Sequence, residues 1–125
     1  MRAFFNLIRW QNLLIVALTM VLMRHAILEP VISKIGVILL KGTGEEIPMA
    51  LQFPWYDFVL LVAATVFITA GGYVINDYFD INTDLINKGK VIVGTKILRR
   101  QAMMWHNLFN IAGVSAGFYI SWEAG

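Results

Sequence analysis

The sequence predicts an all-α protein that forms an integral-membrane helix bundle. Hydrophobic residues make up 58% of the chain and charged residues only 14%, against roughly 45–50% and 25% in soluble domains. A chain of 125 residues is too short to bury that much apolar surface in a core of its own. Lipid is therefore the expected environment, and uncharged apolar runs in lipid are expected to be helices.

The first of three predicted membrane-spanning segments covers residues near 10–28. Arg24 interrupts its apolar run, and we expect this long side chain to reach the membrane interface. Pro30 is expected to close the segment, because proline cannot continue a helix without losing a hydrogen bond. Residues 31–40 then either continue this helix or lie along the interface.

The other two predicted spans cover residues near 55–76 and 101–122. Residues 58–75 carry no charge and are long enough to cross a hydrocarbon core of about 30 Å as a helix. Trp55 and Tyr56 precede them, where amphipathic rings favour the interface. The three spans together predict a single membrane domain over residues 1–125.

Charge bias orients the three predicted spans. The N-terminus and the second loop share one side, which holds the larger group of basic residues: Arg2, Arg9, Lys88, Lys90, Lys96, Arg99 and Arg100. The other side holds Arg24, Lys34 and Lys41. Basic residues collect on the cytoplasmic side, so the N-terminus and the second loop are predicted to be cytoplasmic.

Composition also excludes several kinds of chemistry. The chain has no cysteine, so disulfides, thiolate catalysis and cysteine-bound metals are ruled out. The net charge of +2 is too small to indicate a nucleic-acid partner.

The stretch GGYVINDYFDINTD, Gly71–Asp84, carries the candidate chemistry. On a helix, its four polar residues fall within an arc of about 100°; they are Asn76, Asp77, Asp80 and Asp84. Carboxylates near a helix C-terminus repel one another and oppose the helix dipole. A cation is therefore expected among them.

Oxygen ligands without a nearby histidine or thiol favour Mg²⁺ or Ca²⁺ over zinc. Since Mg²⁺ is commonly held by one or two carboxylates together with substrate phosphates, the pattern favours a metal that bridges the protein to a phosphorylated, lipid-like substrate. Lys88, Lys90 and Lys96 follow as counter-charge for phosphate oxygens. The simpler interpretation is a solvated helix end that ends in turn-forming residues.

The pattern N-D-x-x-D-x-x-x-D, which Asn76–Asp84 meets in full, resembles the first aspartate-rich motif of the UbiA superfamily of intramembrane prenyltransferases. Arg9 and Asn12 also resemble an R-x-x-N pattern of the first span in that family. The resemblance implies that this chain is the N-terminal portion of a roughly nine-helix membrane fold. A basic-Pro-x-basic stretch usually follows the motif, whereas this chain has Asn87-Lys88-Gly89-Lys90 without proline.

The resemblance also implies a Mg²⁺-dependent function. A polyprenyl group would pass from a prenyl diphosphate to an acceptor, often aromatic, within the membrane. Catalysis and metal binding would fall to Asp77, Asp80 and Asp84, and substrate binding to Asn76, Lys88, Lys90, Arg9 and Asn12. The Mg²⁺ ion and the basic side chains would neutralise the departing diphosphate and so favour formation of an allylic carbocation.

Two alternatives compete with this hypothesis. CDP-alcohol phosphatidyltransferases are also aspartate-rich membrane enzymes, but their motif requires a glycine where Ile81 stands. The second alternative is a truncated, catalytically incompetent fragment or a helix-packing module, because no second aspartate-rich motif follows before Gly125. For such a module, the G-x-x-x-G pattern of Gly113 and Gly117 would supply the contact face. Neither the acceptor nor the prenyl length follows from the residues.

Overall fold

The computed structural model describes residues 1–35, 53–81, 86 and 91–124. These residues form an all-α structure, as predicted, and the part of the chain described contains a single isolated bridge between Val93 and Ile97 in place of any strand. The helices are α1 (Arg2–Leu7), α2 (Trp10–Leu22), the π-helix η1 (Met23–Leu28), α4 (Trp55–Phe79) and α6 (Arg99–Ala124).

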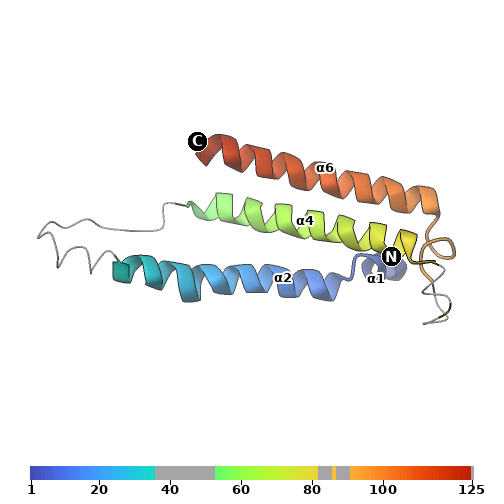
Figure 1. Cartoon of the computed structure of the whole chain (residues 1–125), viewed down its shortest axis with the longest axis horizontal. Helices are drawn as coiled ribbons and strands as arrows, with labels where there is room; N and C mark the ends of the chain where they lie inside the picture. The colour runs from blue at the N-terminus through green and yellow to red at the C-terminus, as the bar shows by residue number, and fades with distance from the viewer. Residues whose placement is uncertain (36–52, 82–85, 87–90, 125) are drawn as a thin grey trace, which may run out of the picture.

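The three long helices lie in a row with α4 in the middle (Figure 1). The main helix–helix contact is between α4 and α6, and α2 contacts α4 but not α6. α2 and α6 run in the same direction and α4 runs opposite to both. The N-terminus, the end of α4 and the start of α6 therefore share one end of the row.

In the described part of the chain, two helical segments are long and apolar enough to cross a membrane: Trp10–Ile35 and Trp55–Phe79. Their outward surfaces suit lipid, because α2 exposes large apolar side chains such as Leu14, Ile15 and Leu18. α6 has a similar length of 26 residues but lacks the same apolar character, so its role as a third span stays a prediction.

Pro30 does not close the first helix, contrary to the expectation. Helical residues continue through it to Ile35, so the alternative in which the helix extends is the one observed. The π-helical segment Met23–Leu28 stands immediately before the proline, and the backbone N–H of Glu29 donates to Arg24 O, five residues back. A π-turn widens the helix and rearranges its hydrogen bonds, which lets the chain accommodate a residue without an N–H.

The buried core lies at the end of the row that holds the acidic motif. It joins the α1–α2 region, the second half of α4 and the start of α6; its members are Leu7, Ile8, Leu13, Ala70, Val74, Val93, Ile97 and Ala102. Phe4 of α1 packs on α6, with its ring centroid 4.9 Å from that of Trp105. The short helix α1 is thereby fixed against the bundle, and the residues that follow it are held close to α4.

Candidate functional site

The first part of the acidic motif, residues 76–80, occupies the last turn of α4 and its C-cap. Asp80 ends the helix with φ −83° and ψ 11°, and the side chain of Asn76 donates to Asp80 Oδ2 over 2.9 Å. The two residues are four apart and therefore lie on the same face. Three of the four residues predicted to group together, Asn76, Asp77 and Asp80, lie at this helix end, and Asp84 lies outside the described residues.

Arg9, which lies between α1 and α2, contacts the acidic motif of α4. Its Nη2 lies 3.0 Å from Asp77 Oδ1 in an ion pair. The aspartate side chain is only 13% exposed and the arginine side chain 38% exposed. The resemblance alone had placed Arg9 near the motif, and the fold brings these two residues together across a separation of 68 positions.

The backbone at Arg9 is unusual and explains how its side chain reaches α4. Arg9 has φ 50° and ψ 53°, and no other non-glycine residue among those described has positive φ. The left-handed turn separates α1 from α2 and precedes the first residue of α2, Trp10. This conformation costs an L-residue about 1–2 kcal/mol, which packing of α1 on the core can offset.

Tyr73 is a site residue that the sequence analysis missed. The guanidinium carbon of Arg9 lies 5.0 Å from the centroid of the Tyr73 ring, and Asn12 Nδ2 lies 3.5 Å from its hydroxyl oxygen, a long contact. The sequence did contain a signal for Tyr73: it precedes Asp77 by four residues and so lies on the same face of the helix as the motif. The tyrosine thus links Arg9 and Asn12 to α4.

Several expected site residues lie outside the part of the chain that the structure describes, namely Asp84, Lys88 and Lys90. Lys96 is described and exposed, in the segment between α4 and α6. Within the described ranges, no three His, Cys, Asp or Glu side chains gather closely enough to hold a metal ion. The described part of the motif thus offers two carboxylates, Asp77 and Asp80.

The oxygen atoms of the described part of the motif suit Mg²⁺ both in type and in number. Carboxylate and amide oxygens from Asp77, Asp80 and Asn76 are the ligands that Mg²⁺ accepts, and Mg²⁺ needs only one or two protein carboxylates when phosphates complete its coordination. Asp77 is largely buried beside a basic side chain, so the same corner could hold a phosphate and a cation together.

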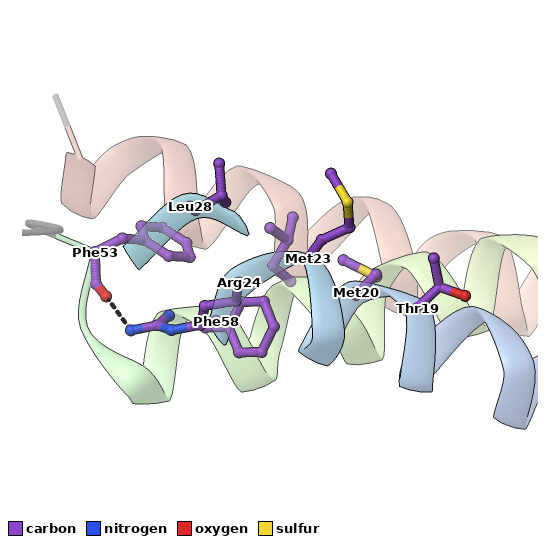
Figure 2. Close-up of a pocket in the computed structure, with 8 residues that line it drawn as sticks. Thr19, Met20, Met23, Arg24, Leu28, Phe53 and Phe58 are labelled. Atoms are coloured by element: carbon purple, nitrogen blue, oxygen red, sulfur yellow. Dashed lines mark hydrogen bonds between the residues drawn. The ribbon is translucent and has the colours of Figure 1, made fainter. Parts of the chain in front are cut away.

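Arg24 lies at the opposite end of the bundle. It is 8% exposed, and its Nη2 donates to Phe53 O over 2.8 Å (Figure 2). That it reaches the membrane interface stays a prediction. Its Nε donates to Glu29 Oε1 over 3.3 Å, a partner that the π-helical spacing brings within reach. The guanidinium also lies over the Phe58 ring, so tertiary contacts hold it inside.

A largely apolar cavity of about 430 Å³ adjoins Arg24. Its lining comes from the later part of the first helix and the beginning of α4, and Figure 2 draws the residues concerned: Thr19, Met20, Met23, Arg24, Leu28, Phe53, Phe58 and Leu61. This cavity is at the end of the row away from Asp77, so the acidic site is not part of it.

His106 of α6 makes a hydrogen bond to α4. Its Nδ1 lies 2.9 Å from Gly71 O of α4; because a carbonyl only accepts, the imidazole donates. Asn110 Nδ2 donates to His106 O within α6 over 2.9 Å. His106 thus ties the two helices together below the acidic motif.

Comparison with known proteins identifies the family. Residues 48–125 match the UbiA prenyltransferase family, and this chain belongs to that family. The matched region includes the motif Asn76–Asp84 and begins after Arg9 and Asn12.

A curated relative is the digeranylgeranylglyceryl phosphate synthase of Methanothrix thermoacetophila, which is 38% identical over 72 residues. The alignment covers 57% of this chain and 27% of the relative. This chain therefore corresponds to a minor part of the relative's length. No solved structure matches it.

Proposed function

We propose that this chain supplies the first aspartate-rich half of the active site of a Mg²⁺-dependent membrane prenyltransferase. The reaction is transfer of a polyprenyl group from a prenyl diphosphate to an acceptor within the membrane. The observation that carries the proposal is the Arg9–Asp77 pair, which joins a phosphate-binding type of side chain to the first aspartate of the motif. Family membership and helices able to cross a membrane support it.

The residues divide between cation and phosphate. Asp77, Asp80 and Asp84 would hold Mg²⁺, with Asn76 orienting Asp80 through the hydrogen bond at 2.9 Å. When bound, Mg²⁺ supplies positive charge that stabilises the departing diphosphate. Arg9, Lys88 and Lys90 would bind the phosphate oxygens, and arginine is well suited to this because its planar fork donates two parallel hydrogen bonds.

The bond changes follow from the substrate class. The C1–O bond of the allylic diphosphate breaks and the diphosphate leaves with the electron pair. The acceptor's nucleophilic atom then forms its bond to C1 and loses a proton. Donors aimed at the leaving oxygens lower the barrier because negative charge develops there. Exclusion of water by the surrounding membrane helices protects the allylic cation.

The acceptor remains a choice between classes. The name of the Methanothrix relative favours a glyceryl phosphate lipid, whereas an aromatic acceptor is the common alternative within the resemblance. Both require the same diphosphate half-site, so the proposal for Asp77 and Asp80 does not depend on this choice.

Binding of geranylgeranyl diphosphate to the purified chain in detergent, with and without Mg²⁺, tests the proposal. We expect binding that requires Mg²⁺ and weakens by about tenfold or more in Asp77→Asn and in Asp80→Asn. Asp57→Asn is the matched control, because it removes the same charge at the other end of α4. Circular dichroism of each variant checks that the helices are retained.

Three outcomes are informative. Mg²⁺-dependent binding that is lost in both motif variants and kept in the control supports the half-site. Equal binding in all four proteins would show that the diphosphate is held elsewhere. Absence of binding by the folded, unsubstituted chain would favour the alternative of a catalytically incompetent fragment.

A further inference from the structure

The proposed half-site does not by itself explain why Arg9 contacts Asp77. A guanidinium that serves only to bind phosphate has no need to contact a metal-binding carboxylate. Yet Arg9 Nη2 lies 3.0 Å from Asp77 Oδ1, and the carboxylate is mostly shielded from solvent. A divalent cation bound to this carboxylate would lie close to the guanidinium, and the two positive charges would repel each other.

We propose that Arg9 is an exchangeable counter-ion, which neutralises Asp77 in the absence of substrate and transfers to the diphosphate when Mg²⁺ takes over the carboxylate. This inference rests on the proposed function. It assigns to Arg9 two partners in turn and makes it a competitor of the metal when no diphosphate is present.

Three features equip Arg9 for two partners. Its side chain is 38% exposed, so the guanidinium edge that does not contact Asp77 is open to a second anion. Arginine carries five N–H donors, and the contact with Asp77 uses one of them. The Tyr73 ring beneath the guanidinium provides a surface that favours the cation without occupying any donor.

The backbone keeps Arg9 at this corner during the exchange. α1 is anchored through Phe4 on α6 and through the buried Leu7, and α2 begins directly after Arg9. The left-handed conformation at Arg9 is thus fixed by structure on both sides. Only the side chain, with its rotatable stem, needs to move between Asp77 and a phosphate.

Asp80, the other described carboxylate of the motif, accepts its hydrogen bond from a different kind of side chain. Asp80 accepts from Asn76, a neutral side chain whose hydrogen bond does not cancel its charge. Asp77 is therefore the carboxylate at which a chain cation and a metal would compete. The consequence is a thermodynamic coupling: a diphosphate that draws Arg9 away frees Asp77, so each ligand strengthens binding of the other.

The test measures Mn²⁺, used as a paramagnetic stand-in for Mg²⁺, bound to the purified chain in detergent, by electron paramagnetic resonance. Titrations run with and without geranylgeranyl diphosphate, and a protein-free series corrects for Mn²⁺ held by the diphosphate itself. The variants Arg9→Gln and Arg9→Met remove the charge and keep an unbranched stem. Arg9→Lys keeps the charge, and Arg2→Gln removes an exposed positive charge from the same end of the bundle.

Arg9→Gln and Arg9→Met are expected to bind Mn²⁺ alone about three- to fivefold more tightly, the size expected for a partly exposed ion pair. The same variants should bind the diphosphate more weakly. Arg9→Lys should keep the Mn²⁺ affinity of the unsubstituted chain, because it keeps the charge, but should bind the diphosphate more weakly, because it lacks the planar fork. Arg2→Gln should change Mn²⁺ affinity by less than about twofold. A merely structural role for Arg9 would weaken both ligands together, so the opposite signs are diagnostic.

Unchanged or weaker Mn²⁺ binding by both neutral variants, with helical content retained, would overturn the exchange while leaving the half-site intact. If the unsubstituted chain binds no Mn²⁺ even with the diphosphate, the half-site and the exchange both fail. If only one neutral variant folds, that variant decides the question.

Discussion

At the scale of single residues, Gly113 marks a place where the backbones of α4 and α6 come into direct contact. A methyl group built on Gly113 would lie 2.6 Å from Ile68 Cγ1 and 2.9 Å from Ala64 O. The backbone oxygen cannot move without displacing α4. At Gly117, one turn further along α6, an added methyl group would meet nothing within 4 Å.

The two glycines therefore provide a matched pair of substitutions. Gly113→Ala is expected to destabilise the chain by about 1–3 kcal/mol, because the added atom must push the helices apart. Gly117→Ala should be neutral or slightly stabilising, within about 1 kcal/mol, since alanine favours a helix more than glycine does. Thermal unfolding in detergent, followed by circular dichroism, measures both, and equal effects would contradict the close contact.

Arg24 illustrates a residue whose environment the sequence could not supply. An arginine near the end of an apolar run commonly extends to the interface. Here its Nη2 and Nε donate to the carbonyl of Phe53 and the carboxylate of Glu29, whereas its buried Nη1 has no hydrogen-bond partner among the described residues. Both partners depend on how the π-helical turn and the start of α4 are placed, which is a tertiary property.

At the scale of helices, the contact between α4 and α6 is held by polar groups as well as by close packing. His106 donates to Gly71 O, and a methyl group on Gly71 would lie 3.0 Å from Asn110 Nδ2. Gly71 thus gives the α6 side chains access to the α4 backbone. Because Asp77 lies six residues later on the same helix, this contact sets the position of the acidic motif relative to α6.

Loss of the inter-helix hydrogen bond should be measurable. His106→Phe is expected to cost about 0.5–1.5 kcal/mol, the range for one hydrogen bond between membrane helices and within folded proteins. Asn107→Ala, at an exposed neighbouring position on α6, serves as the control and should change stability by less than about 0.5 kcal/mol. Unfolding by added denaturing detergent reports the difference; indistinguishable variants would mean that the bond contributes nothing net.

At the scale of the whole molecule, the two ends of the row of helices differ in the residues they contain. The end with the N-terminus and the start of α6 contains the buried core and the acidic motif. The other end contains Arg24 and its apolar cavity. The orientation predicted from basic residues puts the acidic end in the cytoplasm, where a water-soluble diphosphate head group is accessible.

The orientation can be measured directly because the chain lacks cysteine. Thr95→Cys lies between α4 and α6, and Thr43→Cys lies in the glycine-rich polar run KGTGEEIP, residues 41–48, between the first two predicted spans. A membrane-impermeant maleimide should label Thr95→Cys in inverted vesicles and Thr43→Cys in intact cells stripped of their wall. The reverse labelling would invert the predicted orientation, and labelling of both from one side would contradict the span between them.

The sequence by itself determined the helical membrane class, the position of the two long apolar helices and the acidic motif. These follow from composition, from the length of uncharged runs and from the 3.6-residue period, all of which are local properties. Asn76 and Asp80 are four residues apart, so their hydrogen bond is an outcome of the helix alone. The roles of all the candidate site residues stay predictions, as does the metal, and Asp84, Lys88 and Lys90 lie outside the described part of the chain.

Only the tertiary structure decided which distant residues meet. The Arg9–Asp77 pair, the Tyr73 surface beneath Arg9 and the burial of Arg24 all join segments far apart in sequence. Pro30 continues a helix because of the π-turn before it. The physical reason is common to all: a local pattern sets which way a side chain points from its helix, whereas packing between helices sets what that side chain finds there.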